Sequence, residues 1–242
     1  MAKMRIDKLL SNIGIGTRKE VKKFIKEGLV LVNGNTVKDA GLIVDTEFDE
    51  ILFDGEKINY KEFIYIMMNK PKGVISATYD PIEKTVIDLL PQELKARNPF
   101  PVGRLDKDTE GLLLITNDGN LAHKLLSPKK NVIKKYYAEI LGFVNERDIK
   151  AFKEGIVLED GYKTLPADLE ILLSSEVSKV YVYIREGKYH QIKRMFESVG
   201  KKVVYLKRLA MASLTLDENL KPGQWRELSY EELAFLKKSI QK

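Results

Sequence analysis

Charged side chains concentrate in the short segment 103–111, which holds Arg104, Asp106, Lys107, Asp108 and Glu110 between two glycines. A carboxylate that is fixed beside a cation stays ionised, and an ionised carboxylate can take up a proton or attack an electrophilic carbon. Asp is also a frequent turn residue, because its side chain bonds to nearby backbone groups. Turn capping is therefore the alternative role of Asp106. The residue types alone do not distinguish among the three carboxylates.

The residues after this segment predict the scaffold that positions it. The apolar run Leu112–Ile115 predicts a buried strand. A helix is expected over 121–126, opened at Gly119 or Asn120. Asp106 thus comes just before a core strand, where a rigid element can fix its carboxylate.

The composition excludes several classes of site. The chain has 242 residues, of which 44% are hydrophobic, enough for one large domain or for a small and a medium one. No cysteine is present and only two histidines are, so neither a disulfide framework nor a Cys-based or His-rich metal site is expected. No apolar run reaches the roughly 20 residues of a membrane span, and the N-terminus lacks a signal-peptide core. We expect a cytoplasmic protein.

Positive charge is concentrated at the N-terminus. Residues 1–38 contain nine Lys or Arg against three acids, whereas residues 39–60 contain seven acids and one Lys. Thr17 and Glu20 have the spacing of a capping box, and the helix they predict has its cations four residues apart. Like charges at that spacing repel, so a phosphate backbone explains them better than a solvated surface does. The candidate RNA contacts are Arg5, Lys8, Arg18, Lys19 and Lys22, with Lys23 and Lys26 beside them.

This N-terminal segment resembles the S4 RNA-binding domain. The similarity is carried by Arg5–Leu10, Thr17–Val21 and Gly28–Gly34, and it extends to about Ile58. Asn33-Gly34 predicts a hairpin turn within it. The resemblance implies structured RNA as a partner and implies no chemistry by itself. We expect an S4 RNA-binding domain over residues 1–60.

Residues 61–242 mix predicted strands and helices without strict βαβ alternation. Strands are expected over 63–68 and from Lys134 onward, with 74–78 as a hairpin partner of the first, and a terminal helix over 230–239. This order favours an α+β fold. A small S4-like α/β domain would precede a larger domain with a mixed, largely antiparallel sheet flanked by helices.

The larger segment resembles the pseudouridine synthases along its full length. Three ordered motifs carry the similarity, which are 103–112, 135–137 and 190–194, and they favour the RsuA-type branch, which acts on ribosomal RNA. The resemblance implies that Asp106 is the catalytic aspartate, that Tyr137 stacks on the target base and that Lys193 pairs with Asp106. It also implies that Arg104 and Arg194 contact the substrate. A pseudouridine synthase domain is expected over residues 61–242.

The reaction implied by this resemblance isomerises a uridine to pseudouridine, with no redox change and no group donor, so no cofactor is expected. The expected substrate is small-subunit (16S) rRNA, in the context of a ribosomal subunit assembly intermediate, and the expected state is a monomer. A large-subunit (23S) rRNA enzyme of the same family is one alternative, and a non-catalytic rRNA-binding or assembly protein is another. A metal-dependent nuclease would gather carboxylates around Mg²⁺, which the spacing of Asp106, Asp108 and Glu110 does not match.

Overall fold

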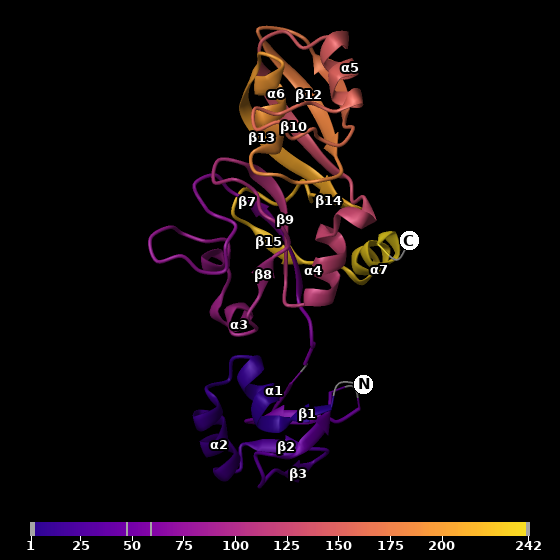
Figure 1. Ribbon diagram of the computed structural model, residues 1–242. Coiled ribbons are helices and arrows are strands. Elements are labelled where there is room, and N and C mark those ends of the chain that lie inside the picture. Colours follow the sequence, from indigo (N-terminus) through magenta and orange to yellow (C-terminus); the bar gives the residue numbers. More distant parts are fainter. Residues whose placement is uncertain (1–2, 47, 59, 241–242) are drawn as a thin grey trace. The chain divides into compact units, whose positions relative to one another are not determined.

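The computed structural model describes residues 3–46, 48–58 and 60–240, and these fold into two compact units (Figure 1). Residues 1–64 and 87–99 form the first unit, and residues 65–86 and 100–242 form the second. The predicted boundary after Tyr60 lies close to the first crossing of the chain. No local pattern in the chain predicts that residues 87–99 belong to the N-terminal unit.

The first unit is built on two helices, α1 (Ile6–Asn12) and α2 (Arg18–Lys26). The predicted capping box is present, since Thr17 Oγ1 accepts from the backbone N–H of Glu20 and the Glu20 carboxylate accepts from that of Thr17. The helices bury an apolar stripe that includes Leu9, Leu10 and Val21. Burial of this stripe leaves the basic residues of α2 exposed.

Short antiparallel strands complete the first unit. One sheet has the order β3 (Asn35–Thr36), β2 (Val30–Val32), β5 (Ile51–Phe53) and β6 (Glu56–Lys57), and β1 (Lys3–Arg5) pairs with β4 (Ile43–Asp45). Asn33 and Gly34 both have positive φ, as a two-residue hairpin turn requires, so that predicted turn is confirmed. The returning segment adds η1 (Ile87–Leu89) and α3 (Gln92–Lys95), whose end packs Ala96 against Gly14.

The second unit is organised by one sheet of nine strands. Its main path runs β11 (Asp168–Leu173), β12 (Val177–Ile184), β10 (Lys134–Leu141), β13 (Lys202–Met211), β9 (Glu110–Thr116), β7 (Tyr65–Lys70) and β15 (Trp225–Glu227). β14 (Leu214–Thr215) pairs with β13, and β8 (Phe100–Pro101) pairs with β9. Among these pairs only β9 and β13 are parallel. The predicted α+β class with a largely antiparallel sheet is confirmed.

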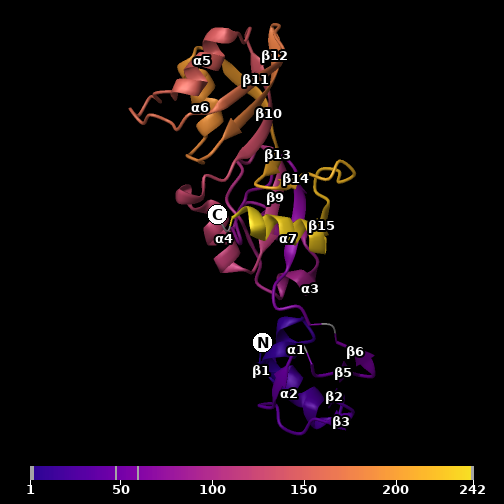
Figure 2. The same cartoon turned by 90° about the vertical axis from the view of Figure 1, so that its right-hand side faces the viewer.

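Two pairs of helices cover this sheet. α5 (Glu146–Glu154) and α6 (Gln191–Ser198) lie on the same side of β10, β11 and β12 (Figure 2). The Phe152 ring of α5 packs on the Phe196 ring of α6, with the ring centres 4.8 Å apart. α4 (Gly119–Leu126) and α7 (Tyr230–Ser239) bury their apolar sides with β7 and β9. Burial alternates along β10, where Lys134, Tyr136 and Ala138 are buried and Lys135 and Tyr137 are not.

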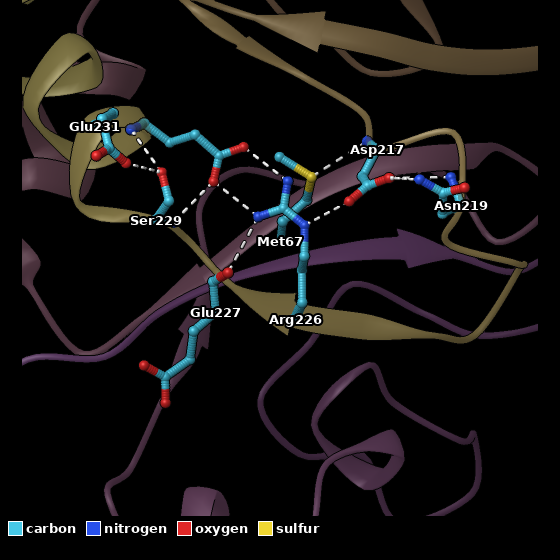
Figure 3. A network of polar contacts seen from close by, with 8 residues as sticks. Met67, Asp217, Asn219, Arg226, Glu227, Ser229 and Glu231 are labelled. Atoms are coloured by element: carbon cyan, nitrogen blue, oxygen red, sulfur yellow. Dashed lines mark hydrogen bonds and ion pairs between the residues drawn. The ribbon is translucent and has the colours of Figure 1, made fainter.

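An ion-pair network fixes the C-terminal helix (Figure 3). The guanidinium of Arg226, on β15, donates to Asp217 at 2.6 Å and to both carboxylate oxygens of Glu232, on α7, at 2.7 Å. Ser229 caps the same helix, because its hydroxyl accepts from the backbone N–H of Glu232. The predicted helix over 230–239 is confirmed with its bounds.

One predicted pairing is wrong. Residues 74–78 do not form a hairpin with β7, because β7 pairs with β9 on one side and β15 on the other. In that segment Ile75 makes only an isolated bridge with Thr85. The partners of β7 lie far away in the sequence, so the local turn chemistry after Lys70 did not indicate them.

Candidate active site

The loop between β8 and β9 carries Asp106, and a buried lysine holds its backbone in place. Lys70, the last residue of β7, is fully buried. Its ammonium donates to the carbonyl oxygens of Asp106 (3.0 Å), Thr109 (2.9 Å), Pro71 (3.0 Å) and Lys107 (3.4 Å). The loop therefore wraps around a cation, which fixes the direction of the Asp106 side chain.

Further hydrogen bonds tie the same loop to residues 73–76. Ser76 Oγ accepts from the backbone N–H of Leu105 at 3.0 Å and donates to its carbonyl at 2.9 Å. The backbone N–H of Gly73 donates to the carbonyl of Lys107 at 2.8 Å. Burial lowers the pKa of Lys70 to about 8, and the negative charges of Asp106, Asp108 and Glu110 oppose that shift. The Lys70 ammonium and the carbonyls it binds therefore form a buried polar clamp on the Asp106 loop. The carboxylates of that loop act electrostatically on the Lys70 ammonium.

Lys193, on α6, reaches the carboxylate of Asp106. Its Nζ lies 3.3 Å from Asp106 Oδ2 and 2.6 Å from Asp108 Oδ1. The Lys193 side chain is 18% exposed and that of Asp106 is 28% exposed, so the pair is partly shielded from water. The predicted pairing of Lys193 with Asp106 is present in the structure, and Asp108 joins it.

The electrostatics of this group stabilise charged forms. Burial lowers the pKa of Lys193, but the hydrogen bond to Asp108 and the charge of Asp106 raise it above its ordinary value. Burial raises the pKa of the Asp108 carboxyl, but the hydrogen bond from Lys193, the charge of Lys193 and smaller contributions together bring it below its ordinary value. Lys193 is therefore a fixed cation next to two carboxylates, of which Asp106 is the less exposed.

The loop before α6 brings two further rings to Asp106. His190 Nε2 lies 3.8 Å from Asp106 Oδ1, and the backbone of His190 is left-handed, with φ of 48°. The exposed ring of Tyr189 stacks on the His190 ring at 3.9 Å. A non-glycine residue with positive φ stores strain, which is often found at functional sites.

Tyr136, and not Tyr137, shares a cavity with Asp106. The cavity has about 70 Å³ and is lined by Asp106, Lys193, Tyr136, Ile184 and Leu206, among others. Side chains alternate along a strand, so Tyr137 projects from the other face of the sheet. There its ring meets Tyr181 and Tyr205, and its hydroxyl donates to Glu139 at 3.0 Å. The structure does not bring Tyr137 together with Asp106.

Arg104 and Arg194 have different surroundings. Arg104 is exposed and lines the Asp106 cavity and two adjoining cavities of about 500 and 460 Å³. Arg194 follows Lys193 on α6, but its guanidinium pairs with Asp160 at 2.6 Å. Arg104 therefore stands at the cavities, whereas Arg194 is engaged in a protein contact.

The basic residues of the first unit are mostly free of such contacts. Arg18, Lys19 and Lys22 on α2 are exposed, as is Lys8 on α1. Other basic residues of this unit are paired. Lys23 lies 3.7 Å from Glu27 and Lys57 lies 2.8 Å from Glu50, and the guanidinium of Arg5 donates to both carboxylate oxygens of the buried Asp7 at 3.0 and 2.8 Å. The pair ties Arg5 to α1 and partly neutralises its charge.

The described residues contain no group of three His, Asp or Glu side chains arranged to hold a metal ion. Within the same part of the chain, none of the helices has the length and apolar character to cross a membrane.

Two site residues were missed from the sequence. Lys70 ends an otherwise buried strand, and a lysine in such a strand is itself a sign of a special contact, because lysine is seldom fully buried. Tyr136 was missed because Tyr136 and Tyr137 are adjacent and only the orientation of β10 shows which of them faces Asp106. Thr109 is also buried beside this cavity, and its hydroxyl bonds to no residue in the described ranges.

The chain is similar to known proteins over nearly its whole length. A family model described as RNA pseudouridylate synthase matches residues 64–198, and one described as S4 domain matches residues 4–51. An uncharacterised RNA pseudouridine synthase of Bacillus subtilis is 52% identical over 96% of this chain and 98% of its own length.

Two relatives are named for a ribosomal subunit. A ribosomal small subunit pseudouridine synthase A of Vibrio cholerae is 39% identical over 96% of this chain and 98% of its own. A ribosomal large subunit pseudouridine synthase B of B. subtilis is 38% identical, with 96% and 95% covered. Among solved structures, a crystal structure of a pseudouridylate synthase superposes with a TM-score of 0.68 at 36% identity, covering 96% of this chain and 99% of that one.

Proposed function

This chain belongs to the RNA pseudouridylate synthase family, and from that premise we propose that it isomerises a uridine of small-subunit (16S) rRNA, with Asp106 as its catalytic residue. The observation that carries the assignment is the position of Asp106, whose backbone Lys70 clamps and whose carboxylate meets Lys193 at 3.3 Å beside Tyr136. Asp108 is more exposed, with 67% of its side chain accessible, which favours Asp106 over it. Glu110 is committed to the hydroxyl of Tyr205 at 2.6 Å.

The reaction breaks the bond between C1′ and N1 and forms one between C1′ and C5. The hydrogen on C5 leaves as a proton and N1 takes up a proton, so the product is an isomer of the substrate. An ionised Asp106 can attack C1′ or remove the proton on C2′, and Lys193 keeps a positive charge beside it in either case. A preorganised cation stabilises charge without reorganisation during the reaction. No group donor and no redox partner enters this balance.

Tyr136 replaces Tyr137 in the proposal as the ring that stacks on the target base. A base inside a helix cannot reach Asp106, so it must leave the stack at a cost of a few kcal/mol. Stacking on an aromatic ring contributes about 1–3 kcal/mol per base. Tyr136 is buried on the face of β10 that meets Asp106, and Arg104 at the mouth of the cavities would contact the RNA backbone.

RNA binding in this proposal is shared between the two units. The S4 unit, assigned to residues 1–60, supplies Arg18, Lys19 and Lys22 on α2 and Lys8 on α1, with a smaller part for Arg5 because Asp7 pairs with it. Residues 61–242 supply the catalytic domain. Arg194 acts by fixing α6 through Asp160, in contrast to the direct substrate contact first expected.

The substrate assignment to 16S rRNA rests on the relative named for the small subunit, and the relative named for the large subunit makes 23S rRNA the second candidate. In this proposal the enzyme acts in the cytoplasm, as a monomer, on an assembling ribosomal subunit.

The decisive experiment maps pseudouridine in rRNA from cells that lack this protein. We expect one site in 16S rRNA to be lost, to return with the wild-type gene and to stay absent with Asp106→Asn. Purified Asp106→Asn should still bind the RNA within a few fold of wild type, because no RNA-binding cation is changed. A lost site in 23S rRNA would transfer the assignment to the large subunit. Restoration by Asp106→Asn would refute Asp106 as the catalytic residue.

A further inference from the structure

A second cavity adjoins the one at Asp106 and is strongly cationic. It has about 460 Å³, and five basic side chains line it against one acid, Glu186. Arg104, Tyr136, Gly187 and Lys188 line this cavity and the Asp106 cavity alike. The two cavities are therefore neighbouring parts of one cleft in the second unit. Nothing in the catalytic proposal uses the cations at its far side.

Two of those cations are buried. Lys134, on β10, is 8% exposed and Arg208, on β13, is 2% exposed. Lys134 Nζ donates to the carbonyl of Val132 at 3.1 Å, and Arg208 Nε donates to the carbonyl of Leu112 at 2.7 Å. The buried Arg208 Nη2 bonds to no residue in the ranges that the structure describes. A buried donor without a partner costs free energy unless a ligand meets it.

The single acid of the cavity is already occupied. Glu186 accepts from the hydroxyl of Tyr162 at 2.6 Å, from the backbone N–H of Leu165 and from the side-chain amide of Gln191. Burial lowers the pKa of Lys134 to about 8, with the charge of Arg208 acting in the same direction and that of Glu186 against it. Lys134 and Arg208 therefore repel each other, and the one acid that lines their cavity, Glu186, is shared with three other hydrogen-bond donors.

We propose that Lys134 and Arg208 bind a phosphate of the RNA backbone next to the target uridine, with Arg104 closing the site from the loop of Asp106. The inference rests on the proposed function for the identity of the RNA. Tyr136 connects the two positions, because its ring lines both cavities, so a nucleotide whose base stacks there has its phosphate beside the cations. A phosphate can accept several hydrogen bonds at once, which suits a guanidinium and an ammonium converging on one cavity.

The chain offers a matched pair of variants for the test. Lys134→Met removes the buried charge and keeps a long side chain. Lys135→Met removes the neighbouring charge, which lies on the other face of the strand with its Nζ 3.7 Å from the centre of the Tyr181 ring.

Affinity for a 16S rRNA transcript would be measured by filter binding at several salt concentrations. We expect Lys134→Met to bind about tenfold more weakly and to flatten the slope of log K against log salt by about 0.7, one phosphate contact in a single strand. Lys135→Met should keep the wild-type slope, and Lys134→Arg should restore it.

A second measurement separates a backbone phosphate from a free anion. Inorganic phosphate should compete with the transcript for the wild-type protein more strongly than for Lys134→Met, at constant ionic strength. If phosphate binds at Lys134 but the salt slopes of Lys134→Met and wild type agree, the site takes a free anion and the proposal is overturned. Equal affinities and slopes for both variants would overturn it too. If Lys134→Met does not fold, which circular dichroism would show, Lys134→Gln takes its place.

Binding is measured here without turnover, so failure of the catalytic proposal is seen separately. Isomerisation releases the hydrogen on C5, so a transcript labelled with tritium at C5 of uridine reports activity directly. A wild-type protein that binds with the expected slope but releases no tritium would refute the rRNA substrate and leave the phosphate site standing.

Discussion

The two units hold their basic residues in opposite settings. On α2, Arg18, Lys19 and Lys22 are exposed to solvent. In the second unit, Lys70, Lys134 and Arg208 are buried among backbone carbonyls and rings. Exposed cations attract RNA of any sequence at long range and are screened by salt, whereas buried cations act only on the group that reaches them. The first unit therefore suits capture of RNA and the second suits placement of one nucleotide.

If this comparison holds, the largest effect comes from the most deeply buried cation. Lys70→Met leaves three carbonyl oxygens of the Asp106 loop and that of Pro71 without their donor, and we expect a loss of about 4 kcal/mol in the free energy of unfolding of the second unit. Trp225 is the one tryptophan of the chain and lies on β15 next to β7, so its fluorescence during denaturation by urea reports the unfolding of this unit. Lys72→Met is the control, since Lys72 is exposed and should change stability by less than about 0.5 kcal/mol. Equal stabilities of the two variants would contradict the clamp.

The next effect tests whether a fixed cation beside Asp106 serves catalysis. Lys193→Met should lower kcat about 100-fold, equivalent to about 3 kcal/mol, because the carboxylate keeps its place and loses its partner. Arg194→Met changes the adjacent residue of α6, which pairs with Asp160, and should keep kcat within a few fold. Tritium release under single-turnover conditions measures both. A larger loss of kcat for Arg194→Met than for Lys193→Met would show that Arg194 contacts the substrate directly.

Tyr136 and Tyr137 provide a comparison between the two faces of one strand. Tyr136→Ala should lower kcat/KM about 30-fold, since one stacking contact is worth about 2 kcal/mol, and Tyr136→Phe should retain most activity. Tyr137→Ala lies on the opposite face, where it removes contacts with Tyr181 and Tyr205, and should cost activity little. The reverse ranking would reinstate Tyr137 as the stacking residue.

The smallest effect is expected on α2. The double variant Arg18→Glu and Lys22→Glu should weaken RNA binding about tenfold at low salt and flatten the salt slope, because each cation contacts the backbone without fixing a geometry. Its kcat at saturating RNA should stay at the wild-type value. Lys57→Glu, on β6, reverses one charge of the same unit outside α2 and is the control, although it also breaks the ion pair of Lys57 with Glu50 at 2.8 Å. An unchanged slope in the double variant would show that the α2 surface faces solvent in the complex.

Much of the fold could be predicted from the sequence wherever the determining interactions are local. The capping box of Thr17 and Glu20, the turn at Asn33 and Gly34, and the helix Tyr230–Ser239 depend on residues a few positions apart. The pairing of β7 with β15 joins residues more than 150 positions apart, so no local pattern indicates it. The expectation that residues 74–78 form a hairpin with the first strand of this unit is wrong for the same reason.

The site could be predicted in part for the same reason. The motif resemblance predicted Asp106 and Lys193 as site residues. The fold brings them together, because Asp106 lies in the loop before β9 and Lys193 lies on α6. The resemblance assigned the stacking role to Tyr137, whereas Tyr136 is the residue that shares the cavity with Asp106, because one residue of strand register exchanges the two faces of a sheet. Lys134 and Arg208 stand 74 positions apart in a lysine-rich chain, and only the pairing of β10 with β13 makes them neighbours.

The return of residues 87–99 to the first unit bears on how this protein folds during synthesis. The chain crosses between the units after Ile64, after Val86 and after Pro99. A ribosome that has released only the first 64 residues has therefore not yet supplied the whole N-terminal unit, which is complete once residue 99 emerges. Residues 65–86, which include β7 and Lys70, emerge before that point and must wait for β9. Neither unit is one continuous stretch of the chain, so separating the two units would need a rejoined chain in place of a single cut.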